Sequence, residues 1–121
     1  MQKIKKQEIG KLGEDIACDY LKHKEYKIIE RNFRCRQGEI DIIAIDIEKE
    51  EIVFIEVKSR TSLEYGEPAE AVDRIKQKHI YQSARYYIYK NEIKNIAIRL
   101  DIIEVYLYRN NNKVNHIKQA F

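Results

Sequence analysis

The sequence predicts one α/β domain over residues 1–121, with a mixed β-sheet flanked by helices, and three observations support this fold class. The length of 121 residues is typical of a single domain. Apolar residues recur at helical spacing in two segments and gather elsewhere in the short runs that are typical of strands. Only four Gly and one Pro interrupt these patterns, which indicates few turns and long elements.

The first half of the chain is expected to form a helix followed by three strands. Apolar residues at three- and four-residue spacing predict the helix over residues 7–23. Residues 26–33 predict a first strand, and Gly38 marks the turn that follows it. Residues 39–47 and 52–59 are rich in Ile and Val and flank a short acidic stretch, which predicts a β-hairpin.

The second half is expected to form a helix and two strands. Pro68 suits the first turn of the helix, which we expect to run to about residue 90. Its predicted core face consists of Val72, Ile75, His79, Ile80, Ser83, Ala84, Tyr87 and Ile88. Residues 96–108 predict a strand, with a bulge or bend where Ile102 and Ile103 change the phase of alternation. A last strand over residues 113–118 completes the order α-β-β-β-α-β-β, in which helices must cover the apolar strands.

Composition and charge limit the classes of protein to which this sequence can belong. The chain has 23 Lys+Arg against 20 Asp+Glu, and this interleaved net charge of +3 permits nucleic-acid binding without indicating it. A hydrophobic content of 44% excludes a fully disordered chain. Apolar runs are too short for a membrane span, and the N-terminal segment lacks the apolar core of a secretory signal. We therefore expect a cytoplasmic protein with no membrane partner, in which Cys18 and Cys35 are reduced thiols.

Two neighbouring predicted strands carry acidic residues among apolar ones. Asp41 lies in the strand 39–47, and Glu56 and Lys58 share one face of the strand 52–59 because side chains alternate along a strand. In a hairpin, Asp41 can lie close to Glu56. Two carboxylates offer the oxygen ligands that Mg²⁺ prefers, and a lysine beside them can position a water or stabilise charge on a phosphate. This group favours metal-assisted hydrolysis of phosphodiesters.

The Glu-x-Lys pattern is weak by itself, because the chain contains three copies. The copy at Glu56 differs from the others by lying in an apolar strand that follows a second apolar strand with an acid. The structural alternative is that Lys58 only neutralises Glu56 or Asp41. Glu14 is a further candidate, because its helical neighbours are small or apolar. We expect it to point toward protein, where it either supports a metal site or pairs with a base.

Four blocks of residues then occur in a characteristic order over roughly residues 10–106. The first block contains Gly10, Gly13, Glu14, Ala17, Tyr20 and Leu21. The second contains Arg31, Asn32 and Arg34, followed by Gly38, Glu39, Ile40, Asp41, Ile42 and Ile43. The third runs from Phe54 to Arg60, and the last contains Pro68, Ala71, Val72 and Lys76 with Arg99 and Asp101. Together the blocks resemble the YraN-like family of small bacterial proteins. That family looks like a member of the restriction-endonuclease-like, PD-(D/E)xK superfamily and is similar to archaeal Holliday-junction resolvases.

The resemblance implies an αβββαβ core and a set of catalytic residues. It implies that Asp41 and Glu56 bind Mg²⁺, for which Mn²⁺ can substitute, and that Lys58 assists the attacking water. It also implies that Glu14 supports the metal site from the first helix. Ile40 stands where the superfamily pattern often has a proline.

With the resemblance included, we interpret several basic residues as DNA contacts. They are Arg31, Arg34, Arg36, Arg60 and Lys76. Arginine side chains match the geometry of phosphate oxygens, which favours this interpretation. The alternatives are a solvated loop whose arginines are balanced by acids and, for Lys76, an ordinary helix-edge side chain.

Other polar and aromatic residues are given structural interpretations. Glu39 is interpreted as an ion-pair partner of a nearby arginine rather than a metal ligand, and Asp101 with Arg99 as a structural pair. The tyrosines of the second helix, Tyr81, Tyr86, Tyr87 and Tyr89, can stack on unpaired bases. We favour the alternative in which they cover the core.

The leading hypothesis is a cytoplasmic, Mg²⁺-dependent endonuclease that hydrolyses DNA, with branched or structured DNA among its substrates. The alternative is a catalytically silent DNA-binding or scaffold module of recombination or DNA-uptake machinery. Because all four catalytic positions are filled, the enzyme is favoured. A homodimer is compatible with either hypothesis.

Overall fold

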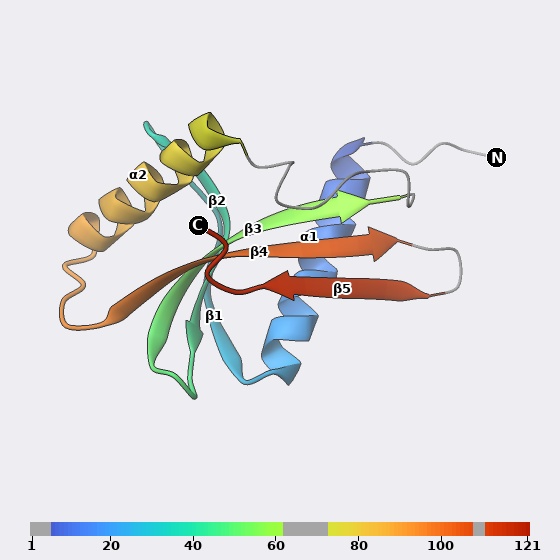
Figure 1. Ribbon diagram of the computed structural model, residues 1–121, viewed down its shortest axis with the longest axis horizontal. Coiled ribbons are helices and arrows are strands. Elements are labelled where there is room, and N and C mark those ends of the chain that lie inside the picture. The colour runs from blue at the N-terminus through green and yellow to red at the C-terminus, as the bar shows by residue number, and fades with distance from the viewer. Residues whose placement is uncertain (1–5, 62–72, 108–110) are drawn as a thin grey trace.

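The structure is a computed structural model that describes residues 6–61, 73–107 and 111–121. Its elements follow the predicted order α-β-β-β-α-β-β (Figure 1). They are α1 (Lys6–His23), β1 (Tyr26–Cys35), β2 (Gly38–Asp46), β3 (Glu51–Arg60), α2 (Arg74–Lys90), β4 (Ala97–Leu107) and β5 (Asn112–Ile117). The α/β fold class and the αβββαβ order are therefore confirmed. Within the described ranges, no helix has the length and apolar character needed to cross a membrane.

The five strands form one mixed sheet in the order β1-β2-β3-β4-β5. Pairing is antiparallel between β1 and β2, between β2 and β3, and between β4 and β5. The central strands β3 and β4 are parallel, and the chain between them contains α2, as a parallel crossover requires. Strand β3 is thus the middle strand of the sheet, with the antiparallel β2 on one side and the parallel β4 on the other.

Two apolar clusters hold the helices on opposite faces of the sheet. One contains Ala17 and Leu21 of α1 with Ile42, Val53, Ile55, Ile103 and Val105. The other contains Ile80, Ala84 and Tyr87 of α2 with Ile40, Ile43, Phe54 and Ile102. Figure 1 shows α1 passing behind the sheet while α2 lies against β2. Because β3 contributes Val53 and Ile55 to one cluster and Phe54 to the other, its alternating side chains are covered on both faces.

The predicted bulge at Ile102 and Ile103 is wrong. β4 keeps one parallel register with β3 from Ala97 to Tyr106. Ile102 packs in the cluster under α2 and Ile103 in the cluster under α1. Two consecutive apolar residues need no change of phase where both faces of the strand are buried.

Helix α2 packs on the sheet over a shorter stretch than predicted. Asp73 is its N-cap and accepts a hydrogen bond of 2.8 Å from the backbone nitrogen of Lys76. The predicted start at Pro68 and the core position Val72 lie outside the described residues. Of the predicted core face, Ile80, Ser83, Ala84 and Tyr87 are buried. Ile75 and His79 are exposed, so the buried side of α2 is narrower than the predicted face.

The expectation that the tyrosines of α2 cover the core is correct for one residue. Tyr87 is buried against Phe33 and Phe54. Tyr81, Tyr86 and Tyr89 are exposed. Helical spacing groups residues on one side of a helix, but it does not say how wide the buried side is.

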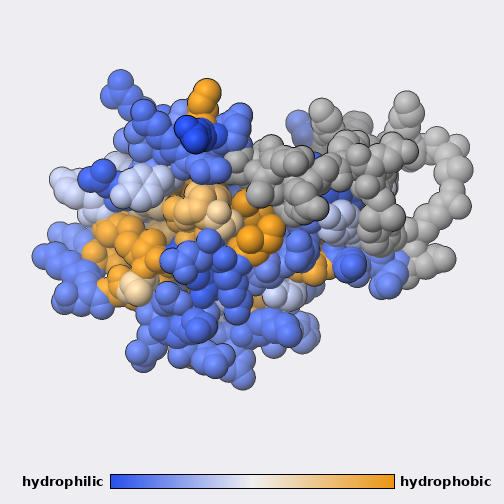
Figure 2. All heavy atoms as spheres, in the orientation of Figure 1, coloured by the Kyte–Doolittle hydropathy of each residue, from blue (hydrophilic) through white to orange (hydrophobic). Residues whose placement is uncertain are grey.

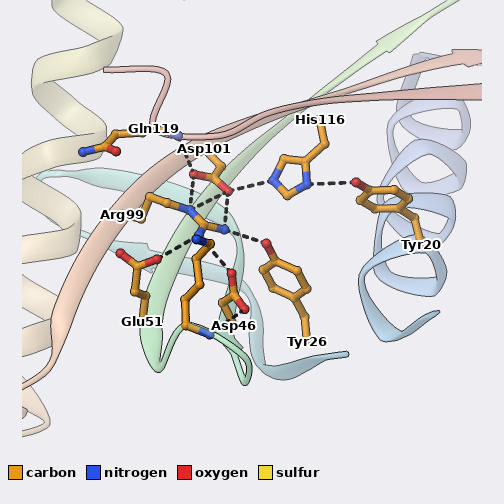
Figure 3. A network of polar contacts seen from close by, with 9 residues as sticks. Tyr20, Tyr26, Asp46, Glu51, Arg99, Asp101, His116 and Gln119 are labelled. Atoms are coloured by element: carbon orange, nitrogen blue, oxygen red, sulfur yellow. Dashed lines mark hydrogen bonds and ion pairs between the residues drawn. The ribbon is translucent and has the colours of Figure 1, made fainter. Parts of the chain in front are cut away.

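A buried arginine ties most of the elements together at one end of the sheet (Figure 3). The Arg99 side chain on β4 contacts Asp46 and Glu51, each at 3.0 Å, and Asp101 at 2.9 Å. The network continues from Asp101 to His116 on β5, whose second ring nitrogen contacts Tyr20 on α1. Burial raises the pKa of Asp101, but its hydrogen bonds with His116 and Arg99 outweigh this and hold the pKa below its usual range. Asp101 and Arg99 therefore form the structural pair that the sequence suggested, within a larger network.

Helix α1 approaches the sheet most closely at Gly13. A Cβ atom placed on Gly13 would lie 1.8 Å from Oγ and 3.1 Å from Cβ of Ser59 on β3. On Gly10, in the previous turn, a Cβ atom would meet nothing within 4 Å. Glycine is therefore required at position 13, whereas position 10 has room for a side chain.

This difference predicts opposite effects of the same substitution. Gly10→Ala should raise the free energy of unfolding by about 0.5–1 kcal/mol, because alanine favours the helix. Gly13→Ala should lower it by about 1 kcal/mol, since overpacking against Ser59 exceeds that gain. Urea denaturation of the two variants tests this, and Ser59→Ala should recover part of the loss in the Gly13→Ala background. Equal stabilisation by both alanines would contradict the close approach.

Candidate functional site

The candidate site lies where strands β2 and β3 separate. Their antiparallel pairing runs from Asp46 opposite Glu51 to Ile42 opposite Ile55 and ends there, while β3 continues to Arg60 beside β4. The next opposed residues would be Asp41 and Glu56. Here the side chain of Asp41, and not the backbone of a paired strand, supplies the acceptor: its Oδ2 accepts a 2.7 Å hydrogen bond from the backbone nitrogen of Val57. The predicted closeness of Asp41 and the Glu56 segment is confirmed.

The two oxygens of the buried Glu56 carboxylate have different surroundings. Its side chain is 5% exposed, and its Oε1 lies 3.4 Å from Nζ of Lys58 and 3.6 Å from Nζ of Lys76. Its Oε2 is buried without a hydrogen-bond partner in the described part of the chain. A buried carboxylate oxygen without a donor is unfavourable unless a cation or water satisfies it. Both lysines lie near Oε1, so Oε2 is available to a cation or a water.

Burial and the neighbouring acidic side chains change the pKa of Asp41. Burial and then the negative charge of Glu56 raise the pKa of Asp41 to about 7, with smaller contributions from Glu14 and Glu39. The hydrogen bond from Val57 opposes this shift. The charged form of Asp41 is thus disfavoured in the folded protein, first by burial and then by the charge of Glu56.

Glu14 reaches the same region from α1. Its Oε1 lies 3.7 Å from Nη2 of Arg31, and its charge contributes to the raised pKa of Asp41. Burial raises the pKa of Glu14, while a hydrogen bond with Asn32 and the Arg31 guanidinium oppose the shift. The expectation that Glu14 points toward protein is therefore correct, and it pairs with a base there.

The five predicted DNA contacts are placed differently by the fold. Lys76 joins the acidic group directly through Glu56. Arg31 is held on α1 by a 2.8 Å contact with Asp15 in addition to Glu14. Arg34 is 78% exposed and forms the expected ion pair with Glu39, at 3.3 Å.

The remaining two arginines lie on either side of this group. Arg36 is exposed in the turn between β1 and β2. Arg60 is at the end of β3, where its Nε lies 3.6 Å from Oε2 of Glu104. Among the five, Arg34 and Arg36 present the most accessible charges for a phosphate.

Sequence reasoning missed two polar residues at the site. Glu104 is fully buried on β4 in register with Lys58 and accepts a hydrogen bond from the Tyr106 hydroxyl. Its signal was present, because it is an acid inside an apolar strand, as Glu56 is. Asn32 lies opposite Asp41 on β1 with a positive φ of 52°, a conformation that asparagine tolerates well. No pattern in the sequence predicts that conformation.

The residues present fit a divalent cation. Asp41 and Glu56 supply carboxylate oxygens, and Oε2 of Glu56 has no donor among the described residues. Burial and then the charge of Glu56 raise the pKa of Asp41, and a bound cation would favour its charged form. No group of three or more His, Cys, Asp or Glu side chains gathers as a metal site in the described ranges. Mg²⁺ commonly uses one or two carboxylates and completes its shell with water, so two carboxylates are sufficient.

A cavity of about 350 Å³ opens beside the acidic group, between α2 and the turn joining β1 to β2. Its walls include Arg34, Gly38, Lys76 and His79. Gly38 has a positive φ of 151°, and a Cβ atom there would lie 3.3 Å from Cβ of His79. The absence of a side chain at Gly38 therefore allows the turn to lie close to α2, and the hollow between them is lined by both basic and acidic side chains, Arg34, Lys76 and Glu39.

The fold and this arrangement define a class of small α/β proteins that carry an acidic pair and a lysine at the opening of a mixed sheet. A family model described as "Uncharacterised protein family UPF0102" matches residues 13–105, and the chain belongs to this family. It is the YraN-like family that the sequence motifs indicated.

Relatives from several bacteria match over nearly their whole length. A UPF0102 protein of Caldanaerobacter subterraneus subsp. tengcongensis is 50% identical, with 100% of each chain covered. A UPF0102 protein of Caldicellulosiruptor saccharolyticus is 44% identical over 98% of this chain and 100% of its own. One of Clostridioides difficile is 48% identical over 94% and 96%.

The raised pKa of Asp41 predicts how the stability of the metal-free protein depends on pH. Between the ordinary value of 3.8 and about 7, the folded protein keeps a proton that the unfolded chain has lost. The free energy of unfolding should therefore fall as the pH rises through this window and level off above it. Asp41→Asn, whose amide oxygen can still accept from Val57, should lack this component.

Urea denaturation in EDTA between pH 4 and pH 8 measures the effect. Asp41→Asn should exceed wild type in stability at pH 8, by on the order of a few kcal/mol, and the gap should close toward pH 4. A gap that does not change with pH would show that the carboxyl of Asp41 titrates normally.

Proposed function

We propose that this protein is a Mg²⁺-dependent endonuclease that hydrolyses phosphodiester bonds in DNA, with branched or otherwise structured DNA as its substrate class. The observation that carries the proposal is the acidic pair at the opening between β2 and β3. Asp41 and Glu56 lie there beside Lys58, and one oxygen of Glu56 has no donor in the described residues. The αβββαβ order, which is that of the restriction-endonuclease-like core, supports the same function.

Each residue of the group has a chemical role in this proposal. Asp41 and Glu56 would hold the cation, which when bound supplies a Lewis acid for a phosphoryl oxygen and a more acidic water. Lys58 lies on the Glu56 face of β3, where its ammonium can orient a water and stabilise negative charge developing on the phosphate. Lys76 holds Glu56 from α2, so that the carboxylate keeps one orientation.

Glu14 and the exposed arginines act around this centre. Glu14 adds negative charge near Asp41 and fixes Arg31, so it contributes to the affinity for a cation. Arg34 and Arg36 are exposed at the β1–β2 turn, where a phosphate backbone can approach the cavity that Arg34 and Lys76 line. DNA is therefore proposed to enter between this turn and α2.

Metal binding can be tested without any substrate. Mg²⁺ or Mn²⁺ should raise the thermal midpoint of wild type, since a ligand of the native state stabilises it by about 2.7 kcal/mol at 100 times its Kd. Glu56→Gln should abolish the shift. Glu92→Gln, which changes an exposed carboxylate just after α2 in another Glu-x-Lys copy, is the matched control and should retain it. An equal shift in Glu56→Gln would remove Glu56 from the metal site.

Cleavage is tested with labelled four-way junction, flap, single-stranded and duplex DNA in Mg²⁺, Mn²⁺ or EDTA. Wild type should cleave at least one of them only with metal. Asp41→Asn and Lys58→Ala should lose about 100-fold or more in rate, because each removes a group that acts on the reacting atoms. Lys27→Ala, in another Glu-x-Lys copy on the exposed side of β1, should cleave normally.

If purified wild type binds these DNAs but cleaves none of them with either metal, the endonuclease is refuted. That result would favour the alternative, a catalytically silent DNA-binding or scaffold module.

A further inference from the structure

Helix α2 concentrates the positive charge of the chain. It contains five of the 23 Lys and Arg residues and no Asp or Glu between Arg74 and Lys90. The remaining sequence has 18 basic residues against 20 acidic ones. The net charge of +3 is therefore the sum of a strongly basic α2 and a slightly acidic remainder of the sequence.

The outward side of α2 interleaves cations and aromatic rings. One stripe, at spacings of four, three, four and four residues, consists of Arg74, Lys78, Tyr81, Arg85 and Tyr89. Residues at these spacings lie above one another on a helix. All five are exposed, and they lie away from the buried side formed by Ile80, Ala84 and Tyr87. We call these five residues the α2 stripe.

The tyrosines of the α2 stripe do not serve the core. Tyr81 is 54% exposed and Tyr89 is 82% exposed. The guanidinium carbon of Arg85 lies 5.9 Å from the centre of the Tyr81 ring, so a cation already lies against one of the two rings. Large rings facing water beside exposed positive charge suit a ligand that carries both flat apolar groups and negative charge.

The position of the stripe links it to the candidate site. Lys76, in the first turn of the same helix, lies 3.6 Å from Glu56. A second cavity of about 350 Å³ opens below the stripe, lined by Tyr81 and Arg85 together with Ile88, Ile98 and Phe121. Figure 2 shows apolar atoms gathered in this part of the face that Figure 1 presents.

We propose that the α2 stripe binds an unpaired strand of DNA, with bases stacked on Tyr81 and Tyr89 and phosphates against Arg74, Lys78 and Arg85. This inference rests on the proposed function and specifies its substrate as DNA that has a single-stranded portion next to the cleavage site. Bases in a duplex are already stacked on one another, so exposed rings select strands whose bases are free. A protein partner would explain the apolar cavity but not a helix without a single acidic residue.

Fluorescence anisotropy measures the interaction with a labelled 15-nucleotide oligo(dT) and a blunt hairpin duplex. The experiment uses Asp41→Asn in EDTA, so cleavage plays no part in the result. Tyr81→Ala and Tyr89→Ala should each weaken binding of oligo(dT) by about 5- to 150-fold, the usual loss for one stacked base. Binding of the duplex should change much less.

Matched controls separate stacking from folding. Tyr81→Phe and Tyr89→Phe keep the rings and should bind within about 3-fold of the parent, since stacking needs the π-face and not the hydroxyl. Ile47→Ala removes an exposed apolar side chain at the β2–β3 turn and should have no effect. Circular dichroism should show the same helix content in every variant.

The salt dependence distinguishes phosphate contacts from stacking. Arg85→Ala should reduce the slope of log Kobs against log salt by about 0.7, the value for one phosphate contact on a single strand. Tyr81→Ala should lower affinity with the slope unchanged.

Two results would overturn the inference. One is oligo(dT) binding that is unaffected by both tyrosine-to-alanine changes, and the other is equal binding of oligo(dT) and duplex by the parent protein. The proposed endonuclease can survive either result, because its own test is metal-dependent cleavage. Conversely, tyrosine-dependent binding without cleavage would keep the α2 stripe and remove the nuclease.

Discussion

The arrangement of the site depends on the separation of β2 from β3 after Ile42 and Ile55. From that step onward the strand pairing of β3 within the described residues is with β4, and the side chain of Asp41 accepts a hydrogen bond from the backbone N–H of Val57. The acidic pair is thus held by backbone geometry rather than by flexible loops. Helix α1 can reach the freed part of β3 because Gly13 has no side chain to strike Ser59. Helix α2 reaches it on the other face through Lys76.

The hairpin of β2 and β3 carries an acidic pair at each end, and the protein treats the two pairs differently. At the turn end, Asp46 and Glu51 share the guanidinium of Arg99, and hydrogen bonding lowers the pKa of Asp46 despite its burial. At the open end, the lysines near Glu56 face only one of its oxygens, and the pKa of Asp41 is raised. The pair at the open end, with one oxygen that lacks a donor in the described residues, is therefore the candidate functional site.

Helix α2 connects the two surfaces that matter for the proposed activity. Its first turn contributes Lys76 to the acidic group, its inward side fills the core through Ile80 and Tyr87, and its outward side presents the α2 stripe. The cavity between this helix and the β1–β2 turn adds Arg34 and His79 to the same approach. An acidic centre bordered by basic surfaces suits a polyanion that must bring its phosphates close to a cation.

The sequence by itself determined the order of the elements, the family and the acidic candidates, because apolar periodicity and motif order are local properties of the chain. It identified Asp41, Glu56 and Lys58 from acids placed among apolar residues, and it placed Glu14 on an inward side of its helix. Tertiary structure decided the rest. The exposure of Ile75, His79 and Tyr81 depends on how much of the helix surface packs on the sheet, and the phase of Ile102 and Ile103 depends on cover from both faces. The burial of Glu104, the backbone conformation of Asn32 and the free oxygen of Glu56 arise from contacts between distant segments, which no local pattern records.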